Sequence, residues 1–235
     1  MKIELNKPCN MHGLFVVFEG IDGSGKSSIC ERVHSCLGWH SLSILNPKRG
    51  FEPTRGMYGK FIRDNLGKLS ATEELSYFLL DRAQNKEQFI QPTLDNDGTI
   101  FLDRYFYSNL VYQSLGDIDI NLILNLNKPV IINPDLVLIL DVAVNTALDR
   151  IDERGNNTAY EKHDFLTKAR AIYNSFEAPN IQIIDANQSF DTVCANATRL
   201  IKEAHVKKKD LQEKYLQLVE ATTEGLWAKL NEKIS

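Results

Sequence analysis

The segment FVVFEGIDGSGKSSICERV, residues 15–33, decides the fold, because three kinds of local structure follow one another in it. An apolar run ends at Gly20, and a glycine-rich turn follows. Ile29, Val33 and Leu37 then repeat at the four-residue spacing of one helix face. A buried strand, a tight turn and an amphipathic helix in succession indicate the start of a parallel α/β sheet.

The turn matches the pattern G-x-x-x-x-G-K-[ST]. Glycines let successive backbone N–H groups turn inward around a phosphate, and the following helix N-terminus adds its free donors. Lys26 can reach the β- and γ-phosphates, and the Ser27 hydroxyl can bind Mg²⁺. The alternative is a glycine-rich turn with an incidental lysine, which leaves the agreement of strand, spacing and helix unexplained. The residues predicted to bind ATP are Gly20, Ile21, Asp22, Gly23, Ser24, Gly25, Lys26, Ser27 and Ser28.

Further apolar runs indicate how the chain is organised. Strands are predicted at 13–20, 41–46, 99–104, 136–142 and 181–186, and they are nearly continuous in apolar residues, as in strands buried on both faces. Helices are predicted between them at about 73–92, 104–115, 146–154, 160–176 and 190–205. The fold class is therefore α/β: a five-stranded parallel sheet between two layers of helices, the three-layer arrangement of P-loop proteins.

The last part of the chain has a different character. We predict a first domain over residues 1–204 and a C-terminal extension over 205–235. Leu211, Tyr215, Leu218, Leu226 and Leu230 give the extension an apolar stripe at helical spacing. We expect an amphipathic helix that packs on the body or on a partner chain.

Composition excludes several classes of protein. The chain has 235 residues, 43% hydrophobic and 25% charged, enough for a sizeable core. A net charge of −4 disfavours duplex nucleic acid as a partner. The four cysteines have no zinc-site spacing, no apolar run is long enough to span a membrane, and the N-terminal segment lacks a signal-peptide core. We expect free thiols and a cytoplasmic protein without a membrane partner.

The segment LDRYFYSNLVYQS, residues 102–114, places polar groups at the end of a strand. Ligands collect at this edge of a parallel sheet, where Arg104 can bridge phosphates and Asp103 can orient Mg²⁺ or hold an arginine. In a following helix, Tyr112 lies one turn after Ser108, with Asn109 and Gln113 beside them. The alternative is an ion pair and a polar flank at a helix start.

Two further pairs lie one helical turn apart. Phe78 could stack on a pyrimidine while Arg82 donates to its carbonyl oxygens. The alternatives are a core aromatic, and an arginine paired with Asp81 or Glu87. Arg150 and Arg154 would project together and could neutralise a transferring phosphoryl group. Their alternative is a solvated charged helix.

Together these segments resemble the thymidylate kinase family. The markers stand in order as FEGIDGSGKSS, EPTRG, FLLDRAQ, LDRYFYSNLVYQ, PDLVLILDV, ALDRIDERG, YEKHDFLTKARAIY and IDANQSF, between about residues 13 and 200. The resemblance implies that Arg104 binds the phosphate of dTMP and that Phe78 and Arg82 recognise thymine. It also implies that Asn109, Tyr112 and Gln113 face the sugar and base, with Tyr112 sensing the missing 2′-hydroxyl.

The same resemblance assigns the remaining site residues. Arg55 is expected to contact the acceptor phosphate in a loop shaped by Pro53, and Asp22 to lie beside that phosphate. The lid is expected at about 150–160, and IDANQSF is expected to line the adenine side. EPTRG replaces a more common Arg-Glu-Pro-Gly-Gly, and Thr158-Ala159 stands where a further lid arginine is common. The catalytic residues expected are Lys26, Arg104, Asp22, Arg150 and Arg154, with Ser27 and Asp103 at the metal.

The expected reaction converts ATP and dTMP to ADP and dTDP with Mg²⁺, in a homodimer as is common in the family. Two alternatives remain open. One is a kinase for another (deoxy)nucleoside monophosphate or for a nucleoside. The other is a P-loop regulatory protein that binds a nucleotide without phosphorylating a small acceptor.

Overall fold

A computed structural model describes residues 1–3, 13–38, 46–153, 155 and 162–234, with side chains as far as residue 222. Its five strands form one parallel sheet in the order β2-β3-β1-β4-β5. Their bounds are β1 Leu14–Glu19, β2 Lys48–Phe51, β3 Thr99–Asp103, β4 Leu136–Asp141 and β5 Ile181–Asp185. The predicted α/β class and five-stranded parallel sheet are thus confirmed.

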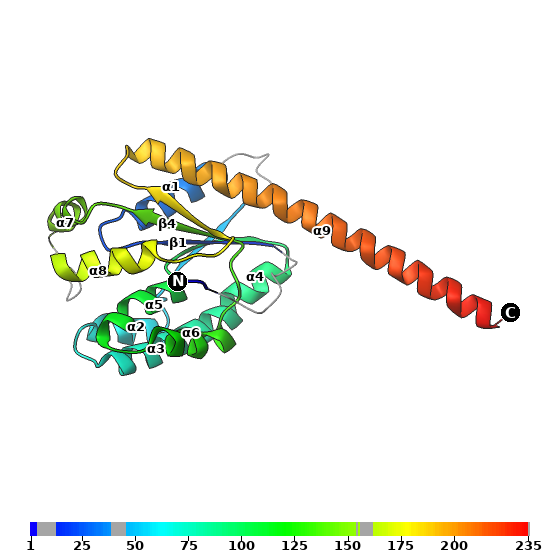
Figure 1. The fold of residues 1–235 in the computed structure, drawn as a ribbon, viewed down its shortest axis with the longest axis horizontal. Coiled ribbons are helices and arrows are strands. Elements are labelled where there is room, and N and C mark those ends of the chain that lie inside the picture. The colour runs from blue at the N-terminus through cyan, green and yellow to red at the C-terminus, as the bar shows by residue number, and fades with distance from the viewer. Residues whose placement is uncertain (4–12, 39–45, 154, 156–161, 235) are drawn as a thin grey trace.

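Helices cover both faces of this sheet (Figure 1). On one face lie α1 and α9, which contact each other, and on the other lie α4, α5 and α8. Helices α2, α3 and α6 pack beyond α5. The bounds are α1 Lys26–Gly38, α2 Met57–Asn65, α3 Ala71–Asn85, α4 Gln91–Asp95, α5 Phe106–Tyr112, α6 Ile120–Asn127, α7 Val144–Asp152, α8 His163–Asn174 and α9 Phe190–Ile234, with a π-helical turn at Lys86–Ile90 and 3₁₀ turns at Ser114–Gly116 and Lys128–Val130.

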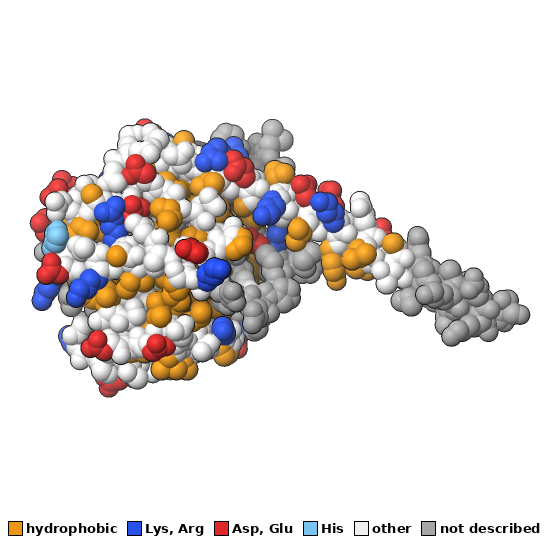
Figure 2. Space-filling view, in the orientation of Figure 1, with side chains coloured by type: hydrophobic (Ala, Val, Ile, Leu, Met, Phe, Trp, Pro, Cys, Tyr) orange, Lys and Arg blue, Asp and Glu red, His pale blue; other side chains and the backbone are white. Residues whose placement is uncertain are grey.

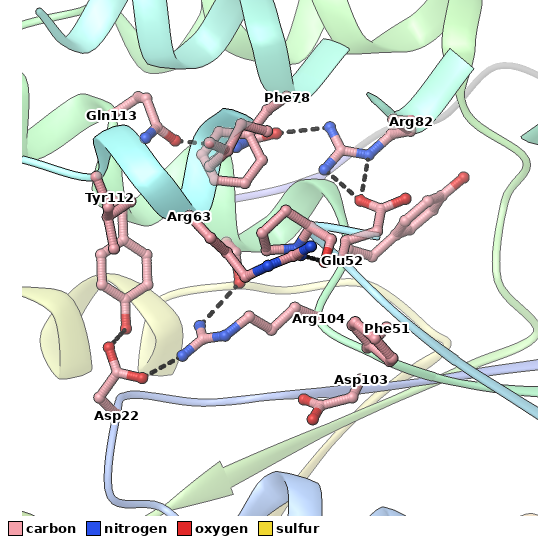
Figure 3. A pocket seen from close by; sticks show the side chains of 16 residues that line it. Asp22, Phe51, Glu52, Arg63, Phe78, Arg82, Asp103, Arg104, Tyr112 and Gln113 are labelled. Carbon is pink, nitrogen blue, oxygen red and sulfur yellow. Dashed lines mark hydrogen bonds and ion pairs between the residues drawn. The ribbon is translucent and has the colours of Figure 1, made fainter. Parts of the chain in front are cut away.

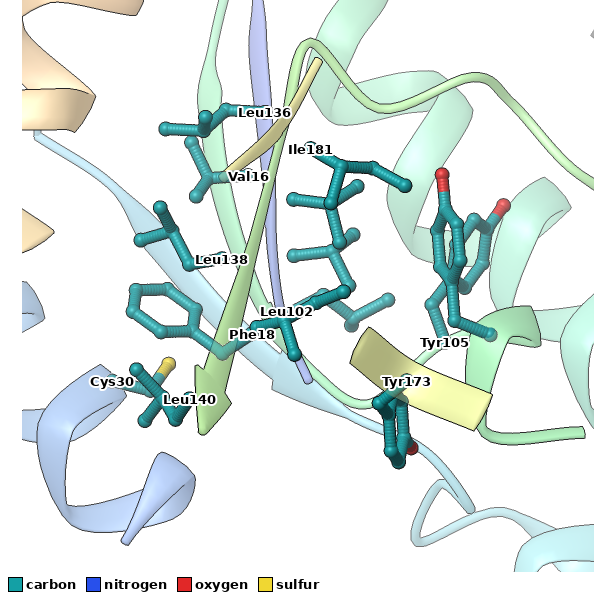
Figure 4. Packing of buried hydrophobic residues seen from close by; sticks show 14 of the residues in the cluster. Val16, Phe18, Cys30, Leu102, Tyr105, Leu136, Leu138, Leu140, Tyr173 and Ile181 are labelled. Carbon is teal, nitrogen blue, oxygen red and sulfur yellow. The ribbon is translucent and has the colours of Figure 1, made fainter. Parts of the chain in front are cut away.

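The core lies on both sides of the central strands (Figure 4). All six residues of β1 are buried, as are five of the six in β4, which is why these strands read as continuous apolar runs. Ile29, Val33 and Leu37, the predicted buried face of α1, are 3%, 0% and 8% exposed. The burial of both strand faces holds the carboxyl ends of β1, β3 and β4 at one edge.

One strand lies later than predicted. The expected strand at 41–46 falls mainly in residues 41–45, outside the described part, and β2 occupies Lys48–Phe51 instead. Among the described strands it pairs with β3 alone, and it is largely exposed, so its sequence KRGF has no apolar signal. An edge strand of this kind can form on backbone hydrogen bonds without an apolar run.

Helix ends also differ from the prediction for local reasons. Ser70 begins α3 through a capping box with Glu73. The single helix predicted at 73–92 is divided by the π-helical turn, because Pro92 supplies no N–H to the ladder. The helix predicted from residue 104 starts at Phe106, since Arg104 has a φ of 67° and Tyr105 is extended.

The C-terminal extension continues the preceding helix without a break. A single helix, α9, runs from Phe190 to Ile234 and leaves the body over its second half (Figure 1). Within its described side chains, Leu211, Tyr215 and Leu218 are 47%, 51% and 65% exposed. The expected packing of this stripe on a partner chain stays a prediction. Among the described residues, no helix combines the length and the apolar character needed to cross a membrane.

Candidate active site

The glycine-rich turn joins the end of β1 to the start of α1. Gly20, Gly23 and Gly25 have φ values of 142°, 78° and 86°, which favour glycine. A Cβ on Gly23 would lie 2.3 Å from the carbonyl oxygen of Ala147, so this position also has no room for a side chain. The turn therefore has the backbone shape that lets several N–H groups face one anion.

Lys26 begins α1 and points back into the turn. Its Nζ donates to the Ile21 carbonyl oxygen at 3.2 Å and lies 3.7 Å from Asp22 Oδ1. Burial, assisted by the nearby charge of Arg104, lowers the pKa of the Lys26 ammonium from 10.5 to about 8. Ser24 Oγ is buried with no hydrogen-bond partner in the described part of the chain. These groups suit an anion with several oxygens.

A cavity of about 310 Å³ opens beside this turn (Figure 3). Its volume is within the range of small-molecule sites, about 300–1,000 Å³. It is formed by the loop after β2, by α2 and α3, and by the end of β3 with α5. Its lining comprises Asp22, Phe51, Glu52, Pro53, Ile62, Arg63, Leu66, Phe78, Arg82, Asp103, Arg104, Tyr105, Ser108, Asn109, Tyr112 and Gln113.

Arg104 joins the cavity to the glycine-rich turn. Its Nη2 donates to Asp22 Oδ1, and its Nη1 donates to Ser108 Oγ at 3.2 Å. Tyr112 OH donates to Asp22 Oδ2 at 3.1 Å, and the Arg104 guanidinium lies 5.4 Å from the centre of the Tyr112 ring. Figure 3 shows the side chains of Asp22, Arg104 and Tyr112 in this arrangement. The predicted phosphate-binding arginine is thus tied to the P-loop aspartate.

A buried polar chain forms the far end of the cavity. Arg82 Nε and Nη2 donate to Glu52 Oε2 at 2.9 and 2.6 Å, and Nη1 donates to Asn109 Oδ1 at 2.6 Å. Asn109 Nδ2 donates to Gln113 Oε1 at 2.9 Å, which orients both amides. Phe78 lines the same end of the cavity (Figure 3). The ion-pair partner of Arg82 is Glu52, 30 residues away, so the alternative pairing with a neighbour on its own helix is wrong.

The loop after β2 presents a different arginine from the one predicted. Pro53 lines the cavity, but Arg55 does not; it is exposed, 5.5 Å from the centre of the Phe51 ring. Arg63 of α2 lines the cavity and donates to the carbonyl oxygens of Pro53 and Thr54 at 2.7 and 2.5 Å. The contact of Arg55 with an acceptor phosphate stays a prediction, and Arg63 is a candidate that the sequence did not suggest. Its one signal was its position in the helix after the loop.

The predicted lid is described only in part. Arg150 lies at the P-loop, where its Nη1 donates to the Gly23 carbonyl oxygen at 3.3 Å and its Nη2 to the Ala186 carbonyl oxygen at 3.2 Å. It therefore joins the P-loop to the segment expected on the adenine side. Arg154 and residues 156–161 lie outside the described residues.

The site offers few protein ligands for a cation, which is expected if phosphates supply most of the ligands. Asp103 lines the cavity, and its Oδ1 is buried with no hydrogen-bond partner among the described residues. Ser27 is exposed in the first turn of α1. The described residues contain no cluster of three His, Cys, Asp or Glu that could hold a metal. A serine hydroxyl and one carboxylate fit Mg²⁺, which commonly takes most of its ligands from phosphates and water.

Two carboxylates missed as site residues end strands at the same edge. Glu19 is fully buried at the end of β1 and accepts hydrogen bonds from α5 and α8. Asp141 ends β4 and accepts from Arg170 Nε and Nη2 at 2.6 and 2.8 Å, which lowers the pKa of Asp141. The sequence placed both at strand ends, but their partners come from helices far along the chain.

Comparison with known proteins agrees with this geometry. The family model described as Thymidylate kinase matches residues 18–197. A thymidylate kinase of Brachyspira hyodysenteriae is 37% identical over 199 residues, covering 83% of this chain and 97% of that protein. A probable thymidylate kinase of Archaeoglobus fulgidus is 32% identical over 189 residues, covering 80% of this chain and 95% of that protein.

A solved structure extends the comparison to the fold. The crystal structure of thymidylate kinase from Ehrlichia chaffeensis superposes with a TM-score of 0.63 at 25% sequence identity, covering 81% of this chain and 99% of that one. The family model ends at residue 197, so the protruding half of α9 lies beyond it. Together with the P-loop and the cavity beside it, these matches show that the chain belongs to the thymidylate kinase family.

Proposed function

We propose that this protein transfers the γ-phosphoryl group of ATP to dTMP, giving ADP and dTDP. The observation that carries the proposal is the link between the two halves of the site: Asp22 of the P-loop binds Arg104 and Tyr112 of the neighbouring cavity. A nucleotide phosphate at Arg104 would then lie across a short gap from phosphates in the P-loop. The names of the relatives support dTMP as the acceptor.

In this reaction an oxygen of the dTMP phosphate forms the bond to the γ-phosphorus. The bond from that phosphorus to the β–γ bridging oxygen breaks, and its electron pair stays with ADP. The acceptor phosphate is already ionised, so the chain needs no strong general base. Its task is to position two anions and neutralise their charge, and the contacts of Lys26, Arg104 and Arg150 with the P-loop support that role for them. Mg²⁺, bound through Ser27 and Asp103, would supply further neutralisation at the phosphates.

The lining of the cavity supports a pyrimidine deoxynucleotide as the acceptor. Phe78 offers a flat face for a base, and the amides of Asn109 and Gln113 are held in fixed orientations at the same end. The Tyr112 ring is fixed by Asp22 and Arg104, so it can exclude a 2′-hydroxyl by its bulk.

An ADP-release assay over a panel of nucleotides tests the proposal. With ATP and Mg²⁺, dTMP is expected to give the highest kcat/KM, ahead of dUMP, dCMP, dGMP, thymidine and ribothymidine monophosphate. Lys26→Ala should lower turnover by about 10²–10³-fold with an unchanged circular dichroism spectrum. A preference for another monophosphate would support the nearest alternative. Slow ATP hydrolysis without any acceptor would instead support a P-loop regulatory protein.

We also propose a homodimer formed through α2, α3 and α6. These adjacent helices expose Met57, Leu80, Leu122 and Leu126 at 70%, 46%, 50% and 43%, and hydrophobic side chains gather on the lower part of the face in Figure 2, where these helices lie. Clustered apolar surface of this kind commonly marks an interface. Light scattering should show a dimer that Leu126→Glu dissociates, whereas Ile183→Glu on the exposed edge strand should leave it intact.

Among the described cysteines, Cys30 and Cys194 are free thiols. Free thiols are typical of a reducing compartment, so we place the protein in the cytoplasm as part of this proposal.

A further inference from the structure

Glu19 is a fully buried carboxylate that directly precedes Gly20, the first residue of the P-loop. Its Oε1 accepts from the backbone N–H groups of Tyr105 and Ser108 at 2.7 and 3.2 Å. Its Oε2 accepts from the hydroxyls of Ser108 and Tyr173 at 2.8 and 2.9 Å. Four donors thus fill the roughly four acceptor positions of one carboxylate.

Two of these hydrogen bonds replace a missing helix cap. Tyr105 occupies the N-cap position of α5, and its side chain makes no capping hydrogen bond. An N-cap side chain normally accepts from the backbone N–H of the second or third helical residue. Ser108 is the third residue of α5, and its N–H is shared between the Tyr105 carbonyl oxygen at 3.0 Å and Glu19 Oε1 at 3.2 Å. The start of α5 is therefore capped by the strand that leads into the P-loop.

The other contacts extend from Glu19 to the guanidinium of Arg104. Because Ser108 Oγ donates its proton to Glu19, its lone pairs face Arg104 Nη1, which donates to it at 3.2 Å. Arg104 itself has a φ of 67°, an uncommon conformation for a residue with a side chain, and its N–H donates to the Phe18 carbonyl oxygen at 2.9 Å. Both the backbone and the side chain of Arg104 are thus held by the end of β1.

We propose that Glu19 is a positioning residue that holds α5 and the Arg104 guanidinium in fixed register with the P-loop. Because it lies beside Gly20, Glu19 would help set the distance between the donor and acceptor phosphates, together with the direct contact of Arg104 with Asp22. Helix α5 also carries Asn109 and Tyr112 and has Gln113 at its C-cap, so the same contact orients the groups at the base end of the cavity. The inference rests on the proposed transfer of a phosphoryl group to dTMP.

Glu19→Gln tests this role with little change in volume. The glutamine oxygen can still accept from the two backbone N–H groups, but its amide must donate toward the Ser108 and Tyr173 hydroxyls and so reverses the polarity of the link to Arg104. We expect kcat/KM for dTMP to fall about 10- to 100-fold, with the KM for dTMP raised. The dissociation constant for ADP, measured by calorimetry, should stay within about threefold of the wild-type value.

A matched control and a double variant separate positioning from mere stability. Asp135→Asn removes a buried carboxylate at the opposite end of the strands, where Asp135 accepts from Phe15 N and Lys208 Nζ at 2.9 and 2.7 Å. It should lower the melting temperature without raising the KM for dTMP. In an Arg104→Ala background, Glu19→Gln should add less than about threefold to the loss, because both act on the same contact.

The outcomes distinguish this inference from the function on which it rests. A wild-type protein that neither binds nor phosphorylates dTMP overturns both. An active wild type with a Glu19→Gln variant of unchanged dTMP kinetics, or with losses that multiply fully with Arg104→Ala, overturns the role of Glu19 alone. If Glu19→Gln does not fold, Ser108→Ala interrupts the same link while keeping the backbone cap. That variant must then raise the KM for dTMP, and an unchanged KM contradicts the proposal.

Discussion

The ion pair between Arg82 and Glu52 should be among the costliest contacts to break in this protein. The two side chains are 1% and 2% exposed and are joined by two hydrogen bonds of 2.9 and 2.6 Å. Glu52 also accepts from Asn85 Nδ2 at 3.1 Å, and Arg82 donates to Asn109 and Asn127. Glu52→Gln keeps the shape of the side chain but removes the charge that neutralises the guanidinium, which is only 1% exposed.

The expected loss follows from that burial. Removing one member of a buried, hydrogen-bonded ion pair costs about 3–5 kcal/mol, because the remaining charge stays desolvated. Removing both members with hydrophobic replacement can cost far less, since the desolvation of two charges is recovered. Glu52→Gln should therefore lower the free energy of unfolding by about 3 kcal/mol or more, and the double variant Glu52→Gln/Arg82→Met by clearly less than the sum of the single changes.

Urea denaturation followed by circular dichroism measures the free energy of unfolding of the wild type, Glu52→Gln, Arg82→Met and the double variant. Glu203→Gln is the surface control, because it removes an ion pair with Arg199 in which both side chains are 59% exposed. It should lower the free energy of unfolding by about 0.5 kcal/mol or less. A loss below about 1 kcal/mol for Glu52→Gln, or additive single changes, would refute the view that this pair holds the base end of the cavity together.

Three further predictions concern the P-loop and the end of β4. The pKa of Lys26 is lowered to about 8, and bound phosphates should raise it. Binding of one ATP at pH 8 should therefore be accompanied by the uptake of about half a proton by the protein. Calorimetry in buffers of different ionisation enthalpy measures this uptake, which should be absent in Lys26→Arg. Hydrogen bonds from α8 lower the pKa of Asp141. The ionised Asp141 therefore stabilises the fold, by about 1 kcal/mol, above pH 3.8, the ordinary pKa of an aspartate, and this stabilisation is lost as the pH falls through the pKa in the folded state. Asp141→Asn should unfold more easily than the wild type at pH 7 but match it in strong acid. Gly23→Ala, whose Cβ would meet the Ala147 carbonyl oxygen at 2.3 Å, should weaken ATP binding more than Gly25→Ala, whose Cβ has no contact closer than 3.9 Å; equal losses in a titration would contradict this.

The parts of the site that are local in sequence could be predicted. Gly20 to Ser27 form a turn whose chemistry depends on neighbouring residues, and the segment from Asp103 to Gln113 keeps its spacing because a strand end and one helix carry it. The buried strands β1, β3 and β4 could be predicted because burial on both faces makes them continuous apolar runs. The exposed edge strand β2 has no such run and could not be predicted.

The remaining contacts depend on how distant elements pack. Glu52 and Arg82 are 30 residues apart, and Glu19 and Tyr173 are 154 apart, so no spacing rule connects them. Whether Arg55 or Arg63 faces the cavity depends on the path of the loop after β2 and on the rotation of α2 against the body, which the sequence does not specify. Arg104 was assigned to a helix start that its positive φ prevents.

The most direct test of the account is a crystal structure with a non-hydrolysable ATP analogue, Mg²⁺ and dTMP. We expect the analogue's phosphates in the turn from Gly20 to Ser27, the dTMP phosphate on the guanidinium of Arg104, and the thymine against Phe78. A dTMP molecule bound elsewhere, or Arg104 and Phe78 directed into solvent with the cavity filled by protein, would contradict the central claim.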